Sequence, residues 1–166
     1  MLRVVQIGLG PLGQKVVRFA LERPGIRMVA AVDQAPDKVG RDLGDVCALK
    51  HLGVPVHKTL ESALKGKRAD VIILTTVSGL HKIAGQIEEI ARFGLPIVST
   101  CEELSFPWGK QPKVAESLDR ICKKHKIACL GTGVNPGFLM DYLPSVLTSV
   151  CQKVDSIRVV RVQNAS

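Results

Sequence analysis

Aromatic residues are scarce in this chain of 166 residues: one Trp, one Tyr and four Phe make up 4% of it. Proteins that bind single-stranded nucleic acids stack bases on aromatic side chains, and few such platforms are available here. The formal net charge of +8 is spread along the sequence instead of forming one basic patch. We therefore expect no nucleic acid as a partner, and the positive charge suits an anionic small ligand at least as well.

The sequence also lacks a long apolar run. No stretch reaches the roughly 18 consecutive apolar residues that a membrane-spanning helix needs. From Met1 the chain passes directly into an alternating strand pattern, without the charged region and apolar core of a secretory signal. We therefore expect no membrane association and a cytoplasmic location.

Cysteines number only five, an odd count, and no two of them form a Cys-x-x-Cys pair. No histidine stands at zinc-finger spacing, so neither a disulfide framework nor a structural metal is indicated. We expect most of these thiols to be buried: Cys47, Cys101, Cys122, Cys129 and Cys151.

Short apolar runs alternate with helical patterns along the chain. The runs are rich in Val, Ile and Leu, as in strands buried on both faces of a parallel sheet: RVVQIG, RMVAAVD, ADVIILTT, LPIVST and KIACLG, with a weaker one at VPVHK. Apolar residues recur at helical spacing between them, most clearly in residues 79–94 and 111–126. Repeated strand–helix units of this size predict an α/β fold, a doubly wound parallel sheet with right-handed crossovers, over residues 1–150.

Three glycines follow the first predicted strand. Gly8, Gly10 and Gly13 form the pattern Gly-x-Gly-x-x-Gly, and with Pro11 and Leu12 they lead into a predicted helix at 12–23. In dinucleotide-binding folds the first glycine makes a tight turn, the second admits the pyrophosphate and the third packs the helix on the sheet. The phosphates then meet free N–H groups at the helix N-terminus. Taken alone, the pattern fits an ordinary turn equally well.

An acidic residue completes the dinucleotide pattern. Asp33 stands at the end of the second predicted strand, where a carboxylate accepts hydrogen bonds from ribose hydroxyls. The order of strand, glycines, helix, strand and acid predicts dinucleotide binding. Asp33 favours NAD, because a carboxylate repels the extra phosphate of NADP. Lys38 and Arg41 follow in a loop. If their side chains reach such a phosphate, NADP is possible as well; the alternative is that they only form a solvated face of the loop.

Further site residues are expected where later strands end, because doubly wound sheets bind ligands at the carboxyl ends of their strands. Thr75 and Thr76 follow the fourth strand of the predicted sheet and could line the cofactor, or merely satisfy their own hydroxyls. Asn135 follows the sixth strand in GTGVNPG. It is either a site residue or simply the N-cap of a helix that carries Leu139 and Leu143.

Two adjacent carboxylates follow the fifth strand. Glu102 and Glu103 are candidates for general acid/base catalysis, because partial desolvation would raise a carboxyl pKa toward neutral pH. In an extended segment only one of them would face the cleft. The alternative is that both are acids at a helix start, where they favour the helix dipole.

Three segments, GLGPLG, STCEELSFPW and GTGVNPGFLMD, carry a family resemblance that covers essentially the whole chain. Together they resemble the 2,4-diaminopentanoate dehydrogenase and native amine dehydrogenase family, within the group that shares the N-terminal domain of dihydrodipicolinate reductase. That reductase itself would carry Gly-Thr-Thr-Gly in place of STCEEL. The resemblance implies NAD(P)-dependent oxidative deamination of an amine, and in reverse the amination of a carbonyl with ammonia. It places Glu102 or Glu103 at the catalytic acid position and Asn135 in the loop near the cofactor.

The C-terminal residues 151–166 read as the first strand of a second domain for substrate binding or dimerisation, which such enzymes contain, so the chain looks truncated. An unpaired edge there predicts a homodimer or a loosely ordered tail.

Two other functions stay open. One is a different oxidoreductase, similar to dihydrodipicolinate reductase or homoserine dehydrogenase. The other is a non-catalytic module that senses NAD or binds a partner, since a fold does not determine a function.

Overall fold

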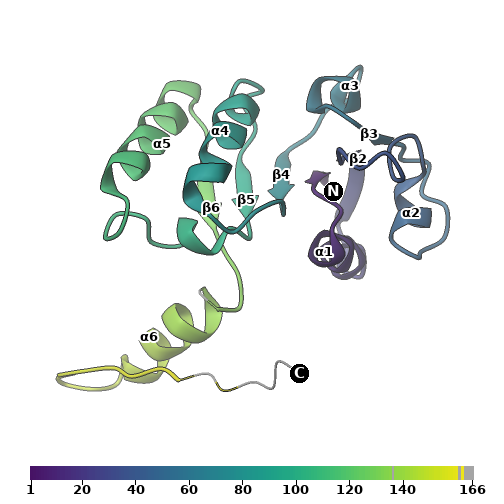
Figure 1. The fold of residues 1–166 in the computed structure, drawn as a ribbon. Coiled ribbons are helices and arrows are strands. Elements are labelled where there is room, and N and C mark those ends of the chain that lie inside the picture. Colours follow the sequence, from purple (N-terminus) through teal and green to yellow (C-terminus); the bar gives the residue numbers. More distant parts are fainter. Residues whose placement is uncertain (136, 161, 163–166) are drawn as a thin grey trace.

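The computed structural model describes residues 1–135, 137–160 and 162. Within them, six parallel strands form a sheet in the order β3-β2-β1-β4-β5-β6, with helices on both sides (Figure 1). The strands are β1 (Leu2–Ile7), β2 (Ile26–Val32), β3 (Val56–His57), β4 (Val71–Leu74), β5 (Ile97–Ser99) and β6 (Cys129–Gly131). The predicted doubly wound parallel sheet is confirmed, including the weakness of its third strand.

Five helices cover the sheet. On one face, α1 (Pro11–Leu21) and α2 (Leu43–Val46) pack against a core that contains Val17 and Leu43. The other face is covered by α3 (Leu60–Leu64), α4 (Leu80–Ala91) and α5 (Pro112–His125). The chain leaves the adjacent strands β1 and β4 toward opposite edges of the sheet, and such a reversal opens a crevice at their carboxyl ends.

The strand sequences are apolar at consecutive positions because both faces of the sheet are covered. Val4 and Val5 of β1 point to opposite faces, and their exposed fractions are 1% and 0%. In β4, Val71 and Ile72 lie beside them in register. No helix among the described residues has the length and apolar character that crossing a membrane requires.

The free thiols are less uniformly buried than expected. Cys47 and Cys101 are buried, Cys122 and Cys129 are half-buried, and Cys151 is exposed. Burial raises the pKa of the Cys129 thiol to about 12, so this thiol stays protonated and unreactive at neutral pH.

The helix after β6 starts differently from the prediction. Asn135 does not cap it: Gly137 precedes a π-helical turn (Phe138–Tyr142), which continues into α6 (Leu143–Thr148). The φ of Gly137 is +121°, and a Cβ there would lie 2.5 Å from the carbonyl oxygen of Gly133. This turn therefore requires glycine, and it shifts the helix start beyond the reach of Asn135.

The strand expected over residues 151–166 is not formed in the described part of that range. Residues 151–160 have no regular secondary structure. A strand requires hydrogen bonds to a neighbouring strand, and the described chain places none beside this segment. The predicted division into residues 1–150 and 151–166, and the predicted homodimer, stay predictions.

The loop between α2 and β3 folds around the carboxylate of Asp42. This side chain, which caps α2, accepts N–H bonds from Gly44, Leu52 and Val54 at 2.7–2.8 Å. Burial alone would raise the pKa of Asp42, but these donors and the nearby His51 outweigh it, so the pKa lies below its ordinary value. Ionisation of Asp42 is therefore coupled to folding.

Replacing Asp42 by alanine should lower the free energy of unfolding by about 2–4 kcal/mol at pH 7, because three donors lose their acceptor. Since folding lowers the pKa, the stabilisation is complete above the ordinary Asp pKa and is lost as pH falls through the folded-state value. Urea denaturation from pH 7 to pH 3 should show this difference shrinking. Asp45→Ala, in the same helix at an exposed position, is the control. An equal loss of stability in both variants would contradict the assignment.

Candidate functional site

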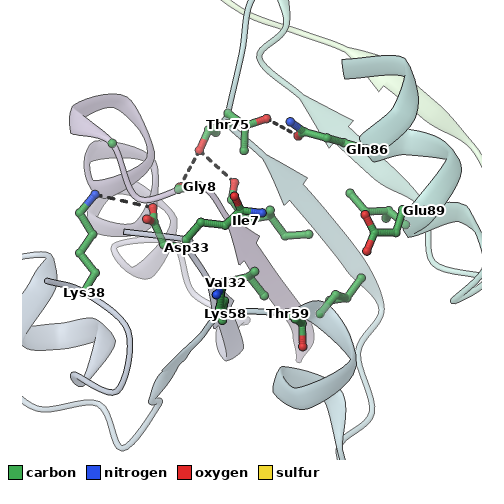
Figure 2. A pocket seen from close by; sticks show the side chains of 15 residues that line it. Ile7, Gly8, Val32, Asp33, Lys38, Lys58, Thr59, Thr75, Gln86 and Glu89 are labelled. Atoms are coloured by element: carbon green, nitrogen blue, oxygen red, sulfur yellow. Dashed lines mark hydrogen bonds and ion pairs between the residues drawn. The ribbon is translucent and has the colours of Figure 1, made fainter. Parts of the chain in front are cut away.

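A pocket of about 450 Å³ lies at the carboxyl ends of β1, β2 and β4. The glycine loop lines it with Gly8 and Gly10, and the end of β2 with Asp33. Its far wall comes from α4, as Figure 2 shows for Gln86 and Glu89. The pocket therefore occupies the crevice that the strand order predicts.

The three glycines of the loop meet three different requirements. Gly8 has φ +88°, and a Cβ there would lie 2.6 Å from the carbonyl oxygen of Thr75. A Cβ on Gly13 would overlap the carbonyl oxygen of Gly8, so glycine allows α1 to approach the loop. Gly10 has φ −63°, and a Cβ there would meet no atom within 4 Å. The fold itself therefore requires Gly8 and Gly13, whereas Gly10 only keeps a space open.

A buried glutamine holds the glycine loop in place. Gln6 of β1 is 0% exposed, and its Nε2 donates to the carbonyl oxygen of Gly8 at 2.9 Å and to Thr75 Oγ1 at 2.8 Å. Thr75 Oγ1 donates in turn to the same Gly8 oxygen at 2.8 Å. Thr75 borders the pocket as predicted, but its hydroxyl group is used within the protein. Gln6 is not among the residues that the sequence patterns single out, although a polar residue inside the apolar run RVVQIG is a signal of such a role.

The N-terminus of α1 faces the pocket through the glycine loop. The helix begins at Pro11, one residue earlier than predicted, and Gly10 provides no side-chain cap. Proline has no N–H, so the unpaired donors of the first turn begin with Leu12 and Gly13. These donors and the helix dipole make this end a suitable site for an anion.

Asp33 lies where the sequence predicts it, at the end of β2. Its two oxygens accept the N–H groups of Leu9 at 2.6 Å and Ala35 at 2.8 Å. Lys38 Nζ lies 3.7 Å from Asp33 Oδ2 and lines the same pocket (Figure 2). Arg41 instead points its guanidinium to the backbone oxygen of Asp37 at an exposed position. Of the two predicted basic residues, the structure brings only Lys38 to the carboxylate.

Thr76 and Gln86 form a second polar contact at the pocket. Thr76 Oγ1 donates to Gln86 Oε1 at 2.6 Å, and both residues line the pocket. Thr76 therefore lies where the sequence predicts a cofactor-lining residue. Its hydroxyl fixes the orientation of the Gln86 amide, a residue that sequence reasoning did not single out.

The glutamates after β5 lie in a 3₁₀ turn (Glu102–Leu104) and not in an extended segment. Glu103 Oε2 accepts the N–H of Leu80 at 2.7 Å and the side-chain amide of Gln111 at 2.9 Å. The Leu80 N–H lowers the pKa of Glu103, and Gln111 lowers it further. The expectation of a raised pKa is therefore wrong for Glu103, because the Leu80 N–H at the start of α4 and the side-chain amide of Gln111 favour its charged form.

The loops after β4, β5 and β6 meet. Cys101 Sγ and the Glu103 N–H both contact the carbonyl oxygen of Ser78, at 3.1 and 3.3 Å. A Cβ on Gly131 would lie 2.7 Å from the backbone of Leu104, so β6 ends against the 3₁₀ turn. Neither glutamate lines the pocket. Asn135 lies outside it too, and its buried Oδ1 has no hydrogen-bond partner among the described residues.

Comparison with known proteins agrees with this geometry. Residues 2–102 match the family model described as dihydrodipicolinate reductase, N-terminus. The 2,4-diaminopentanoate dehydrogenase of Acetoanaerobium sticklandii is 30% identical over 99% of this chain and 47% of its own length. An amine dehydrogenase of Streptomyces virginiae is 26% identical over 95% of this chain and 45% of its own. The resemblance stated from the sequence motifs is confirmed.

A solved structure of amine dehydrogenase from Mycobacterium smegmatis superimposes with a TM-score of 0.83. It is 28% identical and covers 93% of this chain and 45% of that one. The chain thus spans about half the length of the relatives it matches. With a family model that matches from β1 to the start of the 3₁₀ turn, and with the glycine loop and acid in place, the chain belongs to the family of dihydrodipicolinate reductase N-terminal domains.

Proposed function

We propose that this chain is the dinucleotide-binding part of an NAD(P)-dependent oxidoreductase. The observation that carries the proposal is the open space at Gly10, where no atom of the described residues lies within 4 Å of a Cβ built on the backbone. The space lies between the N-terminus of α1 and the pocket at Asp33. A pyrophosphate fits this position, because it combines two negative charges with close approach to a backbone.

The residues around this space fit NAD, with NADP as a second cofactor. Gly8, Gly10 and Gly13 would shape the pyrophosphate site, and Pro11 and Leu12 would start the helix that faces it. Asp33 would accept hydrogen bonds from the hydroxyls of the adenosine ribose. Thr75 and Thr76 would line the cofactor, whose nicotinamide would supply a hydride donor or acceptor when bound. Asn135 is proposed as a further residue near the cofactor, and its unpartnered buried oxygen supports that role.

The reaction that we propose is oxidation of a CH–NH₂ group, with reductive amination of a carbonyl by ammonia as its reverse. Its support is the likeness to 2,4-diaminopentanoate dehydrogenase and amine dehydrogenase. Such chemistry needs a group that accepts and returns a proton near the reacting nitrogen. We assign this role to Glu102, whose side chain makes no hydrogen bond or ion pair among the described residues, and a positioning role to Glu103, whose carboxylate holds the N–H of Leu80 and the amide of Gln111.

Two observations favour other functions. Relatives named 4-hydroxy-tetrahydrodipicolinate reductase also match nearly the whole chain, one from Synechocystis at 24% identity over 97% of it. That supports a reductase with another substrate. Both glutamates are exposed and lie outside the pocket, as in a module that binds NAD without catalysis. Activity assays with amines and with dipicolinate precursors separate these three functions.

The glycine loop gives the first test. Gly10→Val should abolish NAD binding, because the branched side chain fills the space proposed for the pyrophosphate. The fold should survive, since no atom of the part of the chain that the structure describes lies within 4 Å of the new Cβ. Calorimetric titration measures the affinity for NAD, and circular dichroism checks that the variant is folded. Gly13→Ala is the contrasting variant and should destabilise the protein. Unchanged NAD affinity in a folded Gly10→Val variant would refute the pyrophosphate site.

The end of β2 gives the test of cofactor choice. Asp33→Ser should weaken the binding of NAD, because the acceptor for the ribose hydroxyls is lost. It should favour NADP relative to NAD, because the carboxylate that repels the extra phosphate of NADP is gone. The affinity ratio should shift by about 1–3 kcal/mol, as for a charge-assisted hydrogen bond. Asp37→Ser removes an exposed carboxylate four residues away and should leave the ratio unchanged. If the Asp33→Ser and Asp37→Ser variants have the same ratio of NAD affinity to NADP affinity, Asp33 is not the ribose ligand.

The paired glutamates give the catalytic test. The assay uses an enzyme as long as the relatives, in which this chain forms the N-terminal half. It measures the reduction of NAD that depends on an added amine. Glu102→Gln should lower kcat by about 10²–10⁴-fold, the usual contribution of a positioned acid or base, with NAD affinity retained. Glu103→Gln keeps an oxygen for the Leu80 N–H and should lower kcat much less. Full activity of the Glu102→Gln enzyme would rule out the assigned role.

A further inference from the structure

The wall of the pocket formed by α4 carries polar groups that the roles assigned above do not use. Gln86 and Glu89 lie one helical turn apart and both line the pocket. Figure 2 shows them across the pocket from Asp33 and Lys38. The ribose-binding carboxylate and this wall therefore face the same space.

The hydrogen-bonding pattern of this wall has a defined direction. Gln86 Oε1 already accepts the hydroxyl proton of Thr76 at 2.6 Å, so the free part of its amide is the Nε2 donor. The carboxylate of Glu89 can only accept. The wall thus presents one donor beside one acceptor, three residues apart on the helix.

Apolar side chains complete this part of the pocket. Ile90 of α4, Leu60 of α3 and Val32 of β2 belong to the hydrophobic core, with exposed fractions of 5%, 8% and 6%, and all three also line the pocket. An apolar surface next to a donor–acceptor pair suits a flat heteroaromatic ring that has polar groups on one edge.

We propose that this wall of α4 reads the adenine base of the dinucleotide. Glu89 accepts a hydrogen bond from the exocyclic amino group, and Gln86 Nε2 donates to N1, the nitrogen of the six-membered ring beside that group. Adenine offers this order of donor and acceptor, whereas hypoxanthine offers a carbonyl oxygen and a ring N–H, the reverse order. The assignment rests on the proposed dinucleotide function and adds base specificity to it.

The test compares NAD with nicotinamide hypoxanthine dinucleotide, which differs from it only in the base. Calorimetric titration of the 166-residue chain should give about tenfold tighter binding of NAD, the lower end of what a hydrogen bond to a charged group contributes. Glu89→Gln should remove most of this preference, because an amide can rotate to donate to the carbonyl oxygen. Glu88→Gln makes the same change at the adjacent exposed residue, outside the pocket, and should keep the preference.

The possible outcomes are distinct. Equal affinities of the wild-type chain for the two dinucleotides would overturn the base reading and leave the proposed dinucleotide function intact. The base reading would also be overturned if the Glu89→Gln variant kept the preference for NAD, lost affinity for both dinucleotides by the same factor, or behaved like the Glu88→Gln variant. No measurable binding of NAD to the folded wild-type chain would overturn the proposed function itself.

Discussion

The carbonyl oxygen of Gly8 is the point on which the site depends. Gln6 and Thr75 both donate to it, and the Cα of Gly13 packs against it, so β1, β4 and α1 are joined at one atom. A buried carbonyl requires such partners, because an unpaired one is costly. Once the loop is fixed there, Gly10 is left uncovered and the first turn of α1 faces the pocket. The same hydrogen bonds that complete the fold thus prepare a binding surface.

Most polar side chains near the site already have partners within the chain, and this narrows which groups remain for a ligand. The Thr75 hydroxyl is used by the glycine loop, and one oxygen of Glu103 is used by α4. Among the described residues, groups without such partners include the carboxylates of Glu89 and Glu102, the amide nitrogen of Gln86 and the side-chain oxygen of Asn135. Burial and hydrogen bonding therefore separate structural from available groups better than residue type does.

Local patterns in the sequence predict the sheet, its helices and the positions of Gly8, Gly10, Gly13 and Asp33, because each depends on neighbouring residues. Contacts between residues that are far apart in the sequence could not be predicted from these local patterns. Gln6 meets Thr75 across 69 residues, and Glu103 meets Leu80 across 23. The latter contact reverses the direction of a pKa shift that was inferred from a strand end alone. Of the two roles open for Asn135, that of helix N-cap is wrong, because glycine at 137 sets the helix start, and that of site residue stays a prediction.

The ion pair beside the glycine loop bears on cofactor choice in a way that the carboxylate alone does not. Asp33 faces three donors, the N–H groups of Leu9 and Ala35 and the ammonium group of Lys38 at 3.7 Å. These donors offset much of the negative charge that would repel a phosphate on the ribose. Lys38 is only 19% exposed, so solvent and salt screen it less than a surface lysine. A preference for NAD that rests on Asp33 is therefore weaker here than in a site without the lysine, and the acceptor atoms for ribose hydroxyls are retained.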